Sequence, residues 1–337
     1  MNNHFINNIK IENFKCFDNL HVDGIERVNL IGGKNNVGKT AFLEAVELLV
    51  SSNMANDLII NVFQMLMRRQ MFDTEKPGLG FDFIKDDEKI ITINTNNKTC
   101  SINLDSQTQN IIKTITLIFN INGEEKSFPI DNIESLNKLL NNLIKKRTKN
   151  LHINFIDTRK HKEKDIAILY GLLIDLDKES FLNDSLTKFD ENIISLKIIP
   201  TEDYIVLKLK LKNEEQLVLL SSFGEGVNRY IAILCAIWAS KDGFLFIDEV
   251  ENGIHYTNYK KLWQIIFQAS ADANCQVFAT THSKECIEAF NDIQLEQEDG
   301  IYFELYNNVK KNIIMASKMD KNLLKYALTH KEKIRGE

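Results

Sequence analysis

Apolar and polar positions near the start of the chain change from a strand pattern to a helix pattern. The alternating stretch Ile6–Phe17 predicts a strand, and the apolar run Val28–Ile31 predicts a second, buried strand that ends at two glycines. From Thr40 to Leu49 apolar residues recur at helical spacing. This region therefore predicts a strand, a glycine-containing loop and a helix in direct succession.

The last third of the chain alternates short apolar runs with amphipathic segments. Strands are expected at Phe244–Ile247 and Gln276–Ala279, and helices at Glu225–Ser240, Tyr259–Ala271 and Ser283–Phe290, before a hairpin (Ile301–Leu305, Ile313–Met315) and a helix at Lys321–Leu328. Strands that alternate with helices build a parallel sheet with helices on both faces. The pattern predicts an α/β fold with one doubly wound, mostly parallel sheet.

The middle of the chain has a mixed pattern. Helices are expected at Leu58–Met71, Ile133–Lys146 and Asp165–Leu176, and strands at Ile90–Ile93, Ile115–Phe128 (with a hairpin turn at Asn122-Gly123), Leu151–Ile156, Ile193–Ile199, Tyr204–Leu211 and Gln216–Leu220. We therefore expect an antiparallel β subdomain and a helical insertion beside the main sheet. The predicted division is a core of residues 1–50 and 151–337 and a mixed α/β insertion over 51–150.

Composition narrows the class of protein. The 337 residues are 44% hydrophobic and 26% charged, as in globular proteins, and no apolar run is long enough to span a membrane. Five cysteines without a C-x-x-C pair favour a reducing compartment, so we expect a cytoplasmic protein without membrane contact. The net charge of −6 excludes a globally basic nucleic-acid binder, though not a local basic patch.

The loop after the second predicted strand carries the strongest chemical signal. It matches the pattern G-x-x-x-x-G-K-[ST], in which glycines let backbone N–H groups surround phosphate oxygens. In this pattern Lys39 reaches the β- and γ-phosphates and the Thr40 hydroxyl binds Mg²⁺. The expected phosphate-binding residues are Gly33, Asn35, Asn36, Gly38, Lys39 and Thr40.

Two later strands end in polar residues that we expect at the same edge of the sheet. Asp248 and Glu249 follow one of them, and His282 follows the next. Asp248 is placed to hold Mg²⁺, and Glu249 to orient or deprotonate the attacking water. His282 is expected to contact the γ-phosphate.

The segment Ser221–Gly226 precedes a predicted helix. Such a segment caps a helix, and the N-terminus of that helix can also accept a phosphate. With this segment the set of motifs resembles the ATP-binding-cassette (ABC) ATPases, within them the SMC, RecF and OLD-like branch. The resemblance rests on GKNNVGKT, SSFGEG, FLFIDEVENGIHY and TTHS, and on the opening strand IKIENFKCFDNL.

The resemblance implies an ABC ATPase head that uses ATP and Mg²⁺. In such families this serine- and glycine-containing segment covers the ATP held by another subunit. Ser222, Gly224 and Gly226 are therefore expected to bind nucleotide across an ATP-dependent homodimer, with Phe223 where the family usually has a glycine. Asn252, Gly253 and His255 match the loop that crosses the dimer interface, and Gln64 is a weak match to the family's glutamine loop.

Chain length separates this protein from larger relatives. The interval 41–221 has no room for a long coiled coil, and the 54 residues of 284–337 are too few for a TOPRIM nuclease domain. We expect a small bacterial ATPase of AAA type without either part.

A basic cluster lies between Lys145 and Lys164. It has eight basic residues against Asp157 and Glu163: Lys145, Lys146, Arg147, Lys149, Arg159, Lys160, Lys162 and Lys164. Three interpretations stay open: a site for DNA phosphates, a docking surface for an acidic partner and a plain solvated surface. Arg159 follows a predicted strand, so it could instead point toward the nucleotide.

The leading functional hypothesis is an ATP-hydrolysing switch that dimerises on ATP and regulates a separately encoded effector, plausibly a nuclease in bacterial anti-phage defence or DNA maintenance. The alternatives are a DNA-repair ATPase that binds duplex DNA directly through the basic cluster and, more weakly, the energising subunit of a membrane transporter.

Overall fold

The computed structural model describes residues 5–68, 90–109, 112–130, 142–143, 152–159, 163–201 and 205–330. The helix expected over 133–146 falls almost entirely outside these ranges. So does most of the basic cluster, of which Arg159 and Lys164 are described.

The centre of the molecule is a six-stranded sheet with the order β15-β14-β3-β13-β12-β8. Its strands are β3 (Val28–Gly33), β8 (Ile153–Ile156), β12 (Phe244–Ile247), β13 (Gln276–Thr280), β14 (Gly300–Asn308) and β15 (Ile313–Met319). All neighbours are parallel except β15, which returns antiparallel to β14. The expected doubly wound, mostly parallel sheet is confirmed.

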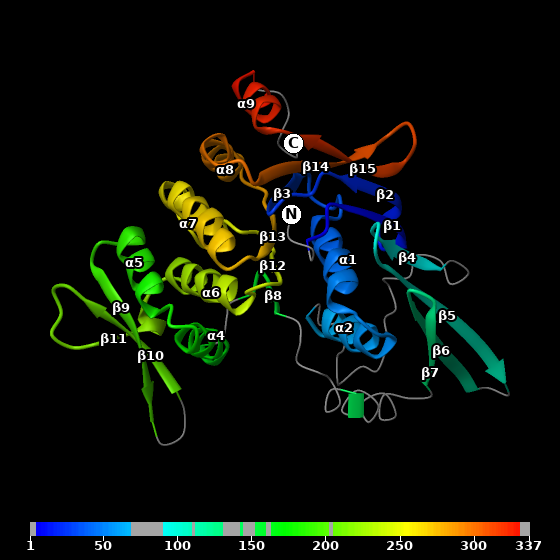
Figure 1. Cartoon of the computed structure of the whole chain (residues 1–337), viewed down its shortest axis with the longest axis horizontal. Helices are drawn as coiled ribbons and strands as arrows, with labels where there is room; N and C mark the ends of the chain where they lie inside the picture. Colours follow the sequence, from blue (N-terminus) through cyan, green and yellow to red (C-terminus); the bar gives the residue numbers. More distant parts are fainter. Residues whose placement is uncertain are drawn as a thin grey trace.

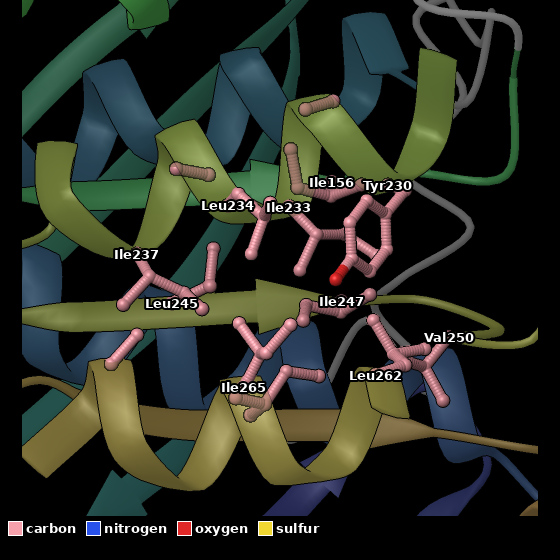
Figure 2. Packing of buried hydrophobic residues seen from close by; sticks show 14 of the residues in the cluster. Ile156, Tyr230, Ile233, Leu234, Ile237, Leu245, Ile247, Val250, Leu262 and Ile265 are labelled. Atoms are coloured by element: carbon pink, nitrogen blue, oxygen red, sulfur yellow. The ribbon is translucent and has the colours of Figure 1, made fainter. Parts of the chain in front are cut away.

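Helices cover both faces of this sheet (Figure 1). Helix α1 (Lys39–Ser51) packs on one face with α2 (Ala55–Arg68) beside it; α6 (Glu225–Ala239), α7 (Tyr259–Asp272) and α8 (Lys284–Glu296) pack on the other. Successive strand residues point to opposite faces. Leu245 and Ile247 accordingly pack against α6 and α7 (Figure 2), whereas Phe244 and Phe246 belong to the core around α1. The apolar runs seen in the sequence are strands buried on both faces.

A second sheet is antiparallel and joins the start of the chain to the middle. Its order is β2-β1-β4-β5-β6-β7, with β1 (Asn8–Phe14), β2 (Phe17–Asp23), β4 (Ile91–Asn94), β5 (Thr99–Gln109), β6 (Ile112–Ile121) and β7 (Glu124–Ile130). The single strand expected over Ile6–Phe17 is thus a hairpin that turns at Lys15, whose φ is +51°. The Asn122-Gly123 turn is confirmed, with positive φ at both residues.

A third, three-stranded sheet lies beside α4 (Glu163–Asp175) and α5 (Glu179–Phe189). Its order is β11-β10-β9, with β9 (Ile193–Pro200), β10 (Ile205–Leu211) and β11 (Val218–Leu219). The strand expected over Gln216–Leu220 is therefore shorter, because the chain enters a 3-10 turn at Leu220–Ser222. Helix α9 (Lys321–Thr329) follows β15, as expected.

Candidate active site

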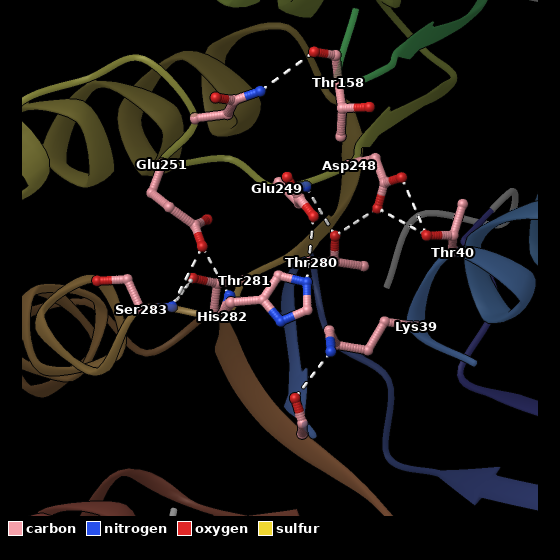
Figure 3. Close-up of polar contacts among 12 residues, drawn as sticks. Lys39, Thr40, Thr158, Asp248, Glu249, Glu251, Thr280, Thr281, His282 and Ser283 are labelled. Atoms are coloured by element: carbon pink, nitrogen blue, oxygen red, sulfur yellow. Dashed lines mark hydrogen bonds and ion pairs between the residues drawn. The ribbon is translucent and has the colours of Figure 1, made fainter. Parts of the chain in front are cut away.

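Three parallel strands, β3, β13 and β12, bring the predicted site residues to one edge of the central sheet. Ala279 of β13 pairs with Leu30 on one side and with Ile247 on the other, so β12 and β13 end within one residue of each other and β3 continues to Gly33. The phosphate-binding loop follows β3, the acidic pair follows β12, and His282 follows β13. The fold thus brings together groups that lie more than 200 positions apart in the sequence (Figure 3).

The loop from Gly33 to Thr40 has a backbone that depends on its glycines. Gly33 and Gly38 have φ of +129° and +90°, and Asn36 has +63°. A Cβ on Gly33 would lie 2.2 Å from the carbonyl oxygen of Leu305, and one on Gly38 would lie 2.3 Å from Cys16 Sγ. Both glycines are therefore required by backbone conformation and by packing. Helix α1 begins at Lys39, so its N-terminus faces this loop.

The ammonium of Lys39 is held inside the site. The residue is 6% exposed, and Nζ donates to the carbonyl oxygens of Gly33 at 2.7 Å and Lys34 at 2.8 Å. Burial lowers the pKa of Lys39 to about 8, although the carboxylates of Asp248 and Glu249 oppose the shift.

Asp248 joins the ends of three elements. Its carboxylate accepts from the hydroxyl of Thr40 at 3.0 and 3.2 Å and from that of Thr280 at 2.7 Å. Burial raises the pKa of Asp248, and the hydrogen bonds from the Thr280 and Thr40 hydroxyls counteract the rise. A hydroxyl and a carboxylate in contact form an all-oxygen donor pair of the kind that Mg²⁺ prefers beside phosphate ligands. The residues present therefore fit a magnesium ion.

The Glu249 carboxylate is in contact with the His282 imidazole, with 3.1 Å between Oε1 and Nε2. Glu249 has a φ of +50°, which is unfavourable for a residue with a side chain. Two hydrogen bonds hold this conformation: the Glu249 N–H donates to Thr280 Oγ1 at 2.8 Å, and Arg229 donates to the Glu249 carbonyl oxygen at 2.8 Å. The buried guanidinium of Arg229 also donates to the carbonyl oxygens of Asp248 and Asp157.

These residues surround a cleft of about 630 Å³. Its lining consists of Lys15, Cys16, Asn35, Asn36, Gly38, Lys39, Thr40, Ala41, Glu249 and His282. Lys15 and Cys16 were not predicted, because only the β1–β2 hairpin brings them over the loop. Lys15 forms an ion pair with Glu44 of α1, and both side chains are largely buried.

The segment Ser221–Gly226 does not line this cleft. Ser222 and Gly224 are exposed at the N-terminus of α6. A Cβ on Gly224 would meet no atom of a described residue within 4 Å, whereas one on Gly226 would lie 2.3 Å from the carbonyl oxygen of Gly253. Gly226 is thus explained by packing within the chain, and Gly224 is not.

The remaining predicted residues lie outside the cleft. Gln64 is exposed on α2 and shares a separate hollow of about 430 Å³ with Arg159, which is paired with Asp157. Asn252 donates to the carbonyl oxygen of Thr158 at 3.1 Å, and Gly253 and His255 are exposed beside it. No helix within the described ranges is both long and apolar enough to cross a membrane.

Two family models match this chain. Residues 5–173 match the family model described as "AAA ATPase domain", and residues 111–288 match the one described as "AAA domain, putative AbiEii toxin, Type IV TA system". The chain belongs to the AAA ATPase domain family. This AAA ATPase is also 28% identical over 335 residues to an "ATP/GTP phosphatase" of Helicobacter pylori, across 87% of this chain and 89% of that protein. Its activity is ATP hydrolysis.

Solved structures show that the AAA ATPase has the fold of an SMC head. The SMC head bound to the C-winged helix domain of ScpA superposes with a TM-score of 0.53 at 10% identity, over 94% of this chain and 98% of that one. An SMC head domain with an extended coiled coil, bound to the C-terminal domain of ScpA derived from Pyrococcus furiosus, gives 0.50 at 10% identity, over 98% and 99%. The expected SMC-like ATPase fold is therefore confirmed.

Proposed function

We propose that this ATPase is a switch in which two chains enclose two ATP molecules and separate after hydrolysis. The observation that carries the proposal is Gly224: it is exposed at a helix N-terminus, and none of the residues that the structure describes requires a glycine there. A glycine without a packing role suits the close approach of a ligand from another molecule. Ser222 lies beside it, equally exposed.

Within each site, different residues of the chain bind the phosphates, hold the metal and activate the attacking water. Gly33, Asn35, Asn36 and Gly38 surround the phosphates with backbone N–H groups, and Lys39 neutralises the β- and γ-phosphates. Thr40 and Asp248 would hold Mg²⁺, which would supply charge stabilisation to the transferred phosphoryl group. Glu249 accepts a proton from the attacking water, and His282, paired with it at 3.1 Å, contacts the γ-phosphate.

We further propose that the ATP-bound dimer controls a separately encoded effector in the cytoplasm, a nuclease in anti-phage defence or DNA maintenance. Two similarities support the idea of a partner: one matching family model is described as a putative toxin of a type IV system, and the SMC heads of similar fold are bound to ScpA. Residues 1–50 and 151–337 form the ATPase core in this proposal. Residues 51–150 form the insertion in this proposal, and its described strands β4 to β7 extend the sheet begun by β1 and β2.

Mixing two inactive variants tests the composite site. Lys39→Ala damages the phosphate loop, and Gly224→Asp places a carboxylate where the partner's γ-phosphate is expected, at a position with open space. If the sites are shared, a mixed dimer has one site with an intact phosphate loop and an intact Gly224. We expect each variant alone to be inactive and an equimolar mixture to recover activity.

The control is a mixture of Lys39→Ala with the double variant Lys39→Ala/Gly224→Asp, which contains no intact site in any pairing. Failure of the first mixture to exceed this control, with both variants folded, would show that each site is complete within one chain.

A further inference from the structure

The loop after β12 carries a third carboxylate, Glu251, that the motifs do not assign. Its Oε1 accepts from the backbone N–H of His282 at 2.6 Å and from that of Ser283 at 3.1 Å (Figure 3). Ser283 is the N-cap of α8. A carboxylate that binds N–H groups at a helix N-terminus is favoured both by charge-assisted hydrogen bonds and by the helix dipole.

The backbone around Glu251 is itself fixed. The Asn252 N–H donates to the Glu249 carbonyl oxygen at 2.9 Å, and the Ile254 N–H donates to that of Glu251 at 3.0 Å. The Val250 N–H donates to the carbonyl oxygen of Thr280 at 2.9 Å. Glu251 therefore projects from a rigid turn that also carries Glu249.

The two hydrogen bonds of Glu251 join the same two loops that the Glu249–His282 contact joins. One loop supplies Glu249 and Glu251, and the other supplies the imidazole and the two backbone donors. The second oxygen, Oε2, is buried without a hydrogen-bond partner among the described residues. Both hydrogen bonds from the His282 loop are thus accepted by Oε1. The distance between the two loops therefore depends on the length of the Glu251 side chain.

We infer that Glu251 is a positioning residue for ATP hydrolysis: its carboxylate holds the backbone of His282 so that the imidazole meets Glu249 and the γ-phosphate. This inference rests on the proposed role of His282. Glu251 itself does not line the nucleotide cleft. Its removal is therefore expected to lower kcat and to leave ATP binding nearly unchanged.

Three substitutions separate the requirements. Glu251→Gln keeps the side-chain length and one acceptor oxygen, so we expect kcat within about threefold of the unchanged chain. Glu251→Asp is one methylene shorter and Glu251→Ala has no acceptor, so both are expected to lower kcat by about tenfold or more, with KM for ATP within about twofold. Glu288→Ala is the matched control, because Glu288 is an exposed carboxylate on α8 that is paired only with Lys284 among the described residues. It should leave kcat unchanged.

The decisive readout is a double-mutant cycle with His282→Ala. If Glu251 acts through His282, then Glu251→Ala should lower kcat by less than about twofold once His282 is already alanine. Full additivity of the two losses, with both single variants folded by circular dichroism, would overturn the inference. So would a Gln variant as impaired as the Ala variant. An unchanged kcat in His282→Ala alone would instead refute the role of His282, and with it the route by which Glu251 acts.

Discussion

The hydroxyl of Thr40 donates to both carboxylate oxygens of Asp248, at 3.0 and 3.2 Å, although 208 positions separate the two residues. Thr40 is the second residue of α1, next to Lys39, and Asp248 directly follows β12. The contact closes the phosphate-binding loop against the acidic strand.

Removal of the Lys39 ammonium should abolish turnover. Lys39 is a buried lysine of the cleft and is placed for the β- and γ-phosphates, so we expect Lys39→Ala to lower kcat/KM for ATP by at least about 10²-fold and to weaken nucleotide binding. Steady-state phosphate release measures the loss. Lys260→Ala removes an exposed lysine on α7 and serves as the control. Near-normal turnover in Lys39→Ala is incompatible with the assigned site.

ATP affinity should fall at alkaline pH because of the same residue. Burial lowers the pKa of Lys39 to about 8, so above that pH the free protein carries a neutral amine. Phosphate requires the ammonium, and binding must therefore take up a proton above pH 8 but not well below it. We expect Kd to be constant below about pH 7 and to rise by up to about tenfold per unit above pH 8.

Calorimetry at pH 9 in two buffers of different ionisation enthalpy measures this uptake directly. We expect close to one proton per ATP for the unchanged chain. The Lys39→Arg variant should show none, because arginine stays charged at this pH. Identical heats in both buffers for the unchanged chain would contradict the prediction.

The two glycines at the start of α6 should respond in opposite ways to alanine. A Cβ on Gly226 would lie 2.3 Å from the Gly253 carbonyl oxygen, so Gly226→Ala should lower the free energy of unfolding by about 1–3 kcal/mol. Gly224→Ala meets open space and should change it by less than about 0.5 kcal/mol, yet reduce ATP turnover. Urea denaturation and phosphate release on the same samples test the pair. Full turnover in Gly224→Ala would argue against a ligand at that position.

The local motifs were predictable because each functional group sits within a few residues of its strand. Gly33, Lys39 and Thr40 form one continuous pattern, and the apolar strands before Asp248 and His282 placed these residues at one sheet edge. The residues that hold the functional groups in place have no recognisable sequence pattern. Thr280, Arg229 and Glu251 act through hydrogen bonds to backbone atoms 19–72 positions away, and such partners become visible only in the fold.

The sequence also concealed some elements. The β1–β2 hairpin turns at Lys15 without a glycine or proline, so the alternation appeared to continue. Strand β5 is rich in polar residues, and α5 buries only Leu182, Ser185 and Leu186, which leaves little apolar periodicity. Gly224 does not line the nucleotide cleft of its own chain. The fold shows this, and the sequence motif alone does not.

The isolated chain should hydrolyse ATP without cutting DNA. Within the described ranges, no group of three or more histidine, cysteine, aspartate or glutamate side chains is arranged to hold a metal. Cleavage of a phosphodiester commonly needs such carboxylates or an activated nucleophile. We expect supercoiled plasmid to stay intact with the chain, ATP and Mg²⁺ or Mn²⁺. Nicked or linear product that disappears on mutation of this chain would reveal a nuclease site.

The central claim, an ATP-dependent dimer, is tested most directly by light scattering of the Glu249→Gln variant. The glutamine cannot take a proton from water, so hydrolysis should slow by about 10²–10⁴-fold while Thr40 and Asp248 still support ATP and Mg²⁺. With saturating ATP and Mg²⁺ at micromolar concentration we predict a two-fold dimer, and without nucleotide a monomer. A Glu249→Gln variant that binds ATP and remains monomeric would contradict the account.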